Sequence, residues 1–109
     1  MFTFIETRLF TRLVTDLLSD DEYVKLQAAL ASDPEAGAVI PRSGGVRKLR
    51  WALPGRGKRG GLRVIYYLRA RQGVIWMLTL YQKNVAESIP AHVLRQIRQE
   101  IEDEQKADS

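Results

Sequence analysis

The residues best suited to chemistry in this sequence are cations carried by three strand-like runs. Lys48 and Arg50 lie in the first run, Arg63 is the second residue of the second, and Lys83 closes the third. A guanidinium fork holds two oxygens of a phosphate at once, and a lysine crowded by other cations can lose its proton near neutral pH. This combination is typical of a phosphate clamp that completes its acid–base pair with the substrate, although a binding surface without chemistry has the same pattern.

A glycine-rich loop, GRGKRG, occupies residues 55–60 between the first two runs. Its letters fit the dinucleotide-binding pattern G-x-G-x-x-G, but that pattern requires a helix after the glycines, and here a strand-like run follows. The loop also lacks the serine or threonine that follows the lysine of a P-loop. We therefore expect a hairpin loop in which Arg56, Lys58 and Arg59 offer charge to phosphates. A plain solvated hairpin is the alternative.

Charge is strongly segregated along the 109 residues, although the net charge is only +4. Residues 37–86 carry eleven lysines and arginines and no acid, whereas all thirteen acids fall in residues 1–36 and 87–109. Such a block indicates a positive surface that meets a polyanion. The alternative is a basic sheet face that is only solvated.

Other kinds of site have little support in the sequence. Cysteine is absent, and no carboxylate cluster or histidine pair offers a metal site, so we expect no metal and no cofactor. His92, the only histidine, falls in the last helical pattern, where a surface or packing role is commoner than catalysis. Because the apolar runs are too short for a bilayer and no signal peptide is evident, we expect a cytoplasmic protein without membrane contact.

Hydrophobic patterns predict a single α+β domain over residues 1–109 with the element order β-α-α-β-β-β-α. We expect a mostly antiparallel sheet with the helices on one side. Two helices begin at Thr7 and at Ser19, which opens the capping box S-x-x-E, and a third begins near Pro90. The expected strands cover residues 2–5, 46–53, 62–69 and 74–83.

The stretch GGVRKLRWALPGRGKRGGLRVIYY, residues 44–67, is followed by WMLTLYQKN, residues 76–84. Together they closely resemble the RelE/ParE superfamily of bacterial toxins and, within it, the HigB-like branch of type II toxin–antitoxin systems. The resemblance extends to FIET, LSDDEY and SIPAHVLRQI and so covers nearly the whole chain. It implies a microbial-RNase-like (RelE-like) fold and a metal-independent, ribosome-dependent endoribonuclease. Such an enzyme cleaves mRNA in the ribosomal A site by 2′-hydroxyl attack, leaves a cyclic phosphate and inhibits translation.

The resemblance also implies roles for single residues. Arg63 matches the arginine of the family's G-x-R-[LV]-[IV]-Y strand. Lys48 and Arg50 match the basic residues of the preceding strand, and Lys83 matches the basic residue that closes the last strand. The tyrosine that some relatives place after this lysine, to stack on a base, is missing, as is the central histidine of some HigB proteins. Contacts with RNA or the ribosome are expected from Arg47, Arg56, Lys58, Arg59, Tyr67 and Tyr81.

Three partners follow from the resemblance: a cognate antitoxin of the helix-turn-helix, HigA-like kind, the 70S ribosome with its mRNA, and operator DNA contacted through the antitoxin. Two other functions stay open. A ParE-like toxin that inhibits gyrase without RNase activity shares the fold, and a non-catalytic nucleic-acid-binding module would carry a similar basic surface. The cations carried by the strands favour RNA over gyrase.

Overall fold

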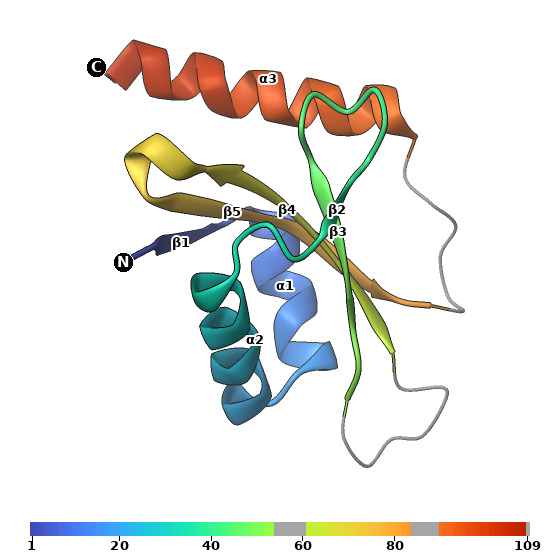
Figure 1. Ribbon diagram of the computed structural model, residues 1–109. Coiled ribbons are helices and arrows are strands. Elements are labelled where there is room, and N and C mark those ends of the chain that lie inside the picture. The colour runs from blue at the N-terminus through green and yellow to red at the C-terminus, as the bar shows by residue number, and fades with distance from the viewer. Residues whose placement is uncertain (54–60, 84–89, 109) are drawn as a thin grey trace.

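A computed structural model describes residues 1–53, 61–83 and 90–108 of the chain (Figure 1). A five-stranded sheet with the strand order β1-β5-β4-β3-β2 forms its centre. The elements in chain order are β1 (Thr3–Glu6), α1 (Arg8–Leu17), α2 (Asp20–Ser32), β2 (Ala38–Val39), β3 (Arg47–Trp51), β4 (Leu62–Arg69), the 3-10 turn η2 (Ala70–Gln72), β5 (Val74–Gln82) and α3 (Ala91–Asp108).

The sheet is mixed, and the predicted α+β class is confirmed. β1 runs parallel to β5, whereas the pairs β4–β5, β3–β4 and β2–β3 are antiparallel. β5 is therefore a central strand, as its continuous apolar run predicts. The short edge strand β2 lies outside the four strands expected from the sequence.

The prediction that all helices lie on one side of the sheet is wrong. α1 and α2 cover one face, and α3 crosses the opposite face (Figure 1). The physical reason is that β4 presents apolar residues on both faces. Val64 and Tyr66 join the core under α1 and α2, while Ile65 packs with Leu94 of α3. A sheet that is apolar on both faces must be covered on both.

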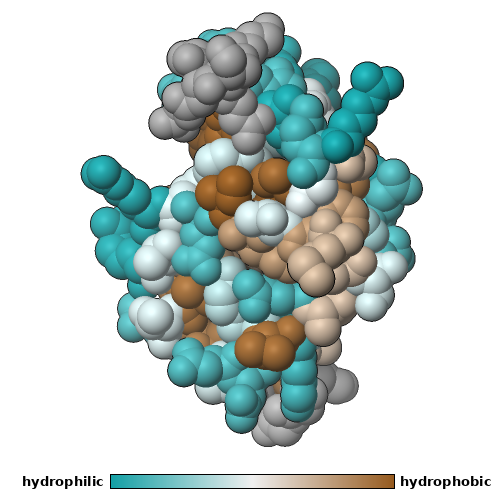
Figure 2. Space-filling model, turned by 90° about the vertical axis from the view of Figure 1, so that its left-hand side faces the viewer, coloured by the Kyte–Doolittle hydropathy of each residue, from teal (hydrophilic) through white to brown (hydrophobic). Residues whose placement is uncertain are grey.

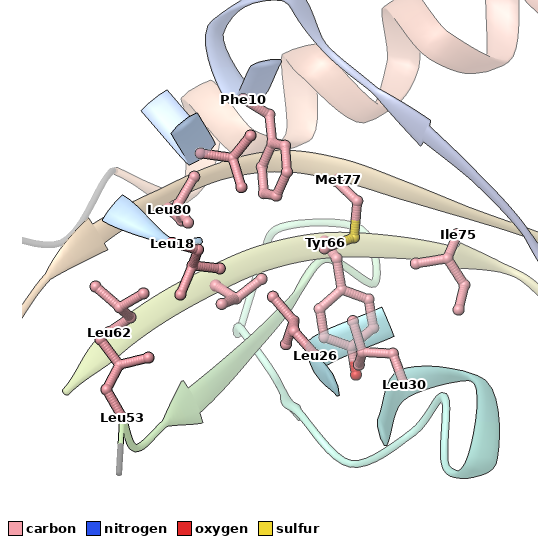
Figure 3. Packing of buried hydrophobic residues seen from close by; sticks show 12 residues of the cluster. Phe10, Leu18, Leu26, Leu30, Leu53, Leu62, Tyr66, Ile75, Met77 and Leu80 are labelled. Atoms are coloured by element: carbon pink, nitrogen blue, oxygen red, sulfur yellow. The ribbon is translucent and has the colours of Figure 1, made fainter. Parts of the chain in front are cut away.

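The larger of the two cores lies between the sheet and the first two helices (Figure 3). Phe10 of α1, Leu26 and Leu30 of α2, and the sheet residue Tyr66 are completely buried in it. Trp51, at the end of β3, packs against this core but remains half-buried. The apolar positions of β3 therefore face α1 and α2, and the alternate positions, Lys48 and Arg50, face the side of α3.

The helix starts follow their sequence signals. The Thr7 hydroxyl accepts the Phe10 N–H at 3.0 Å and donates to the Leu78 carbonyl at 2.7 Å, which ties α1 to β5. Ser19 and Glu22 form the predicted capping box. Within the described part of the chain, no helix is long and apolar enough to span a bilayer.

Candidate phosphate-binding site

Strand register brings the central cations of the sequence together on the α3 side of the sheet. Arg50 of β3 lies directly opposite Arg63 of β4, which in turn lies opposite Tyr81 of β5. Side chains at paired positions point to the same face, so the three form one row across the sheet. Lys83 follows two residues after Tyr81, and its backbone N–H donates to the Gly61 carbonyl at 3.2 Å, which holds the ends of β4 and β5 together.

This end of the sheet contains a shallow depression of about 230 Å³. We call it the Arg63 depression, and its described lining consists of Arg50, Trp51, Ala52, Gly61, Arg63 and Lys83. Arg63 is half-buried, while Arg50 and Lys83 are exposed. The described lining contains three cations and no carboxylate, so an approaching anion meets no acidic side chain in that lining.

Lys48 lies one step further along the same face. It is opposite Ile65, the β4 residue two positions after Arg63, and is half-buried. Because alternate residues of a strand share a face, Lys48 and Arg50 point to the same side. Lys48 is not part of the described lining of the Arg63 depression and instead extends its positive charge toward the loop that precedes β3.

Arg47 does not join this group. Its Nη1 donates to the Gly37 carbonyl at 2.8 Å and to the Glu35 carbonyl at 3.2 Å. It is opposite Tyr66, whose ring belongs to the core under α1 and α2. These contacts give Arg47 a structural role in holding the segment before β2, on the other side of the sheet from the Arg63 depression.

The two tyrosines expected to contact RNA differ in their surroundings. Tyr67 lies under α3, where its hydroxyl donates to Glu102 Oε1 at 2.8 Å. Burial, and then this hydrogen bond, raise the pKa of Tyr67, so the phenol stays protonated and serves as a donor to α3. Tyr81 is half-buried beside Arg63, and its hydroxyl has no partner among the described residues. Of the two, only Tyr81 adjoins the row of cations.

Arg56, Lys58 and Arg59 lie in residues 54–60, outside the described residues. Among the residues that the structure does describe, no group of three histidine or acidic side chains could hold a metal ion.

Trp51 is the residue at this site that the sequence reasoning missed. Its alternation with Leu49 predicts a purely core-facing side chain, yet it lines the Arg63 depression as well as packing on the core. Its position as the last residue of β3 was the available signal, since a strand end leaves part of an aromatic ring uncovered. Because Trp51 follows Arg50 directly in β3, its side chain points to the face of α1 and α2, and it borders the depression only at the end of the strand.

A comparison with models of known protein families finds no match to this chain. The chemical interpretation of the site therefore depends on its own residues and geometry.

Proposed function

We propose that the protein is the toxin of a type II toxin–antitoxin system and acts as a metal-independent endoribonuclease on mRNA in the ribosomal A site. The observation that carries the proposal is the convergence of Arg50, Arg63 and Lys83 on one depression at the end of the sheet. The acid-free block of residues 37–86 and the RelE/HigB-like segments of the sequence also support it.

The chemistry of the proposed reaction follows from the available groups. Arg63 and Arg50 hold non-bridging oxygens of the scissile phosphate and stabilise the charge that develops as the 2′-hydroxyl attacks phosphorus. As the bond from the 2′-oxygen to phosphorus forms, the bond from phosphorus to the 5′-oxygen breaks. The 2′-hydroxyl loses one proton and the leaving 5′-oxygen gains one, so the products are a 2′,3′-cyclic phosphate and a 5′-hydroxyl. Within the described lining, Lys83 is the cation other than the two arginines, and its ammonium group can donate a hydrogen bond to the leaving 5′-oxygen.

The openness of the site accounts for the proposed dependence on the ribosome. The depression is shallow, and no described histidine or carboxylate lines it to orient the attacking hydroxyl. Correct alignment of the attacking group with the phosphate contributes a large share of such a rate enhancement. In this proposal the ribosome supplies that alignment by fixing the mRNA, and a cognate antitoxin keeps the toxin inactive until it is released.

The decisive experiment is induction of the protein in bacteria without an antitoxin, followed by mapping of mRNA 5′ ends. Wild type should arrest growth and create new 5′ ends within translated messages. Arg63→Ala should reduce cleavage by about 100-fold or more, because it removes a charge-stabilising donor. Arg63→Lys should recover only part of the activity, since it keeps the charge but not the fork.

Arg71→Ala is the matched control, because Arg71 is an exposed arginine of η2 at the opposite end of the β4–β5 hairpin. It should cleave as wild type does, and all variants should melt within a few degrees of wild type. Growth arrest with intact messages and a DNA-damage response would contradict the proposal in favour of gyrase. RNA binding without growth arrest would indicate a non-catalytic binding module.

A further inference from the structure

A second cationic pocket lies where the loop before β3 meets the first turns of α3. Its described lining consists of Arg42 from the loop and Ala91, His92 and Arg95 from the helix, and its volume is about 240 Å³. We call it the α3 pocket. Its three polar side chains are exposed, and none has a hydrogen-bond or ion-pair partner in the described part of the chain.

The backbone on the loop side of this pocket is held in an unusual conformation. Arg42 has φ = 64°, a left-handed value that costs a residue with a side chain on the order of 1 kcal/mol. The neighbouring Ser43 is buried, donates its hydroxyl to the Ile40 carbonyl at 2.6 Å and accepts the Val46 N–H at 3.0 Å. These bonds close a tight turn, so Arg42 is presented by a fixed backbone.

The loop is also fixed against α3. Gly44 has φ = 79° and lies so close to Arg98 that a Cβ at this position would overlap the guanidinium group. Arg98 is in turn held by Glu102 at 2.6 Å, one turn along the helix. The loop and the helix therefore keep a defined spacing, which brings Arg42 and Arg95 to the lining of one pocket.

Cations also link the two sites along β3. Lys48 lies between Arg50, which lines the Arg63 depression, and the loop that carries Arg42. At about 3.3 Å per residue, the three steps from Arg50 to the start of β3 cover about 10 Å. Lys48 and Arg50 point to the side of the sheet on which α3 lies, so one strand of a polyanion can pass along the same face.

We propose that the α3 pocket is a second phosphate subsite, which binds a backbone phosphate of the RNA strand whose scissile phosphate lies in the Arg63 depression. This inference rests on the proposed function. Two guanidinium groups and an imidazole supply hydrogen-bond donors and charge, and the adjacent start of α3 adds the positive end of the helix dipole. The subsite fixes the direction in which the strand crosses the sheet.

The test is equilibrium binding of fluorescent 2′-O-methyl RNA, which cannot be cleaved by its own 2′-hydroxyl. A 12-nucleotide strand reaches both sites, because stacked nucleotides advance about 3.4 Å each, whereas a dinucleotide has a single internucleotide phosphate and fills only one. The variant is Arg42→Gly with Arg95→Gln. Glycine accepts the left-handed backbone and glutamine favours helix, so folding is preserved. Thermal melts verify this.

The double variant should bind the 12-nucleotide strand about five-fold more weakly at 0.1 M salt. The slope of log K against log salt should fall in magnitude by about 0.7, the contribution of a single neutralised phosphate. Binding of the dinucleotide should stay within two-fold of wild type. A control with the same net charge, Arg12→Gln with Arg71→Gln, changes exposed residues of α1 and η2 and should leave both affinities and the slope unchanged.

Three results would overturn the inference: unchanged binding of the long strand, an equal weakening for both strand lengths, or an equal weakening in the control. A free anion is distinguished by adding a few millimolar inorganic phosphate at constant ionic strength. If that removes the advantage of the longer strand, the pocket binds free phosphate and the assignment to RNA is wrong.

The inference and the proposed function fail in different ways. A length-dependent weakening of binding in the double variant, without any mRNA cleavage by wild type in cells, would refute the nuclease and support the subsite. Cleavage that requires Arg63, combined with unchanged binding by the double variant, would refute only the subsite.

Discussion

The buried hydroxyl of Tyr66 joins the sheet to the segment between α2 and β2. It accepts the Gly37 N–H at 2.9 Å and donates to the Pro34 carbonyl at 2.7 Å. A Cβ on Gly37 would lie 2.8 Å from the Tyr66 ring, so the close approach requires glycine. Burial raises the pKa of Tyr66, which keeps the phenol neutral and able to donate.

Tyr66→Phe should lower the free energy of unfolding by about 1–2 kcal/mol, because it leaves a buried backbone N–H without its acceptor. The melting temperature should fall by about 5–10 °C in a thermal melt followed by circular dichroism. Tyr81→Phe is the control, since the Tyr81 hydroxyl has no partner among the described residues. Equal melting temperatures for Tyr66→Phe and wild type would show that the two hydrogen bonds contribute nothing net.

At the scale of elements, a small polar network attaches α3 to the sheet. Glu102 accepts the Tyr67 hydroxyl at 2.8 Å and the Arg98 guanidinium at 2.6 Å. The hydrogen bond from Tyr67, followed by the charge of Arg98, lowers the pKa of Glu102 below its ordinary value of 4.5. A lowered pKa means that the folded state favours the carboxylate. The resulting stabilisation is complete above pH 4.5 and is lost as the pH falls through the folded-state value.

Glu102→Gln should therefore lower the melting temperature at pH 7. The difference in melting temperature between this variant and wild type should shrink as the pH is lowered from about 5 to about 3. The measurement is a series of thermal melts across this range. Glu100→Gln, on an exposed position of the same helix, should follow the wild-type pH dependence at every point. If the melting temperatures of Glu102→Gln and wild type differ by the same amount down to the lowest pH, the charge of the Glu102 carboxylate is not the cause of the difference.

At the scale of the whole molecule, folding puts the acids at the start of α2 and the cations of the Arg63 depression on opposite faces of the sheet. The first turn of α2 carries Asp20, Asp21 and Glu22, where acids suit the helix dipole. This turn lies on the opposite side of the sheet from Arg50 and Arg63.

Figure 2 shows the side that lies to the left in Figure 1, where apolar side chains gather near the middle and hydrophilic ones surround them.

RNA binding should consequently weaken steeply with salt. Each phosphate contact on a single strand contributes about −0.7 to the slope of log K against log salt, so Arg63→Ala should reduce the magnitude of the slope by about that amount. Arg12→Ala removes an exposed arginine of α1, on the other side of the sheet, and should leave the slope unchanged. Equal slopes for wild type and Arg63→Ala would mean that Arg63 contacts no phosphate.

Local signals in the sequence were sufficient for the helix starts, the strand alternation and the cationic character of the site. Thr7 and Ser19 cap helices because their hydroxyls reach backbone N–H groups three residues later, an interaction that needs no distant partner. The alternation of Lys48 and Arg50 with Leu49 and Trp51 likewise follows from strand geometry alone.

Tertiary structure decided what depends on register and on the choice of face. Only the pairing of β3 with β4 brings Arg50 and Arg63 opposite each other, whereas the alternation along β3 already puts Arg47 on the other face from Lys48 and Arg50. The apolar stripe of α3 predicts that the helix packs on a sheet, but not on which face. A one-residue change of register would move every side chain of a strand to the other face, so these long-range pairings, which no local pattern encodes, determine which cations share the site.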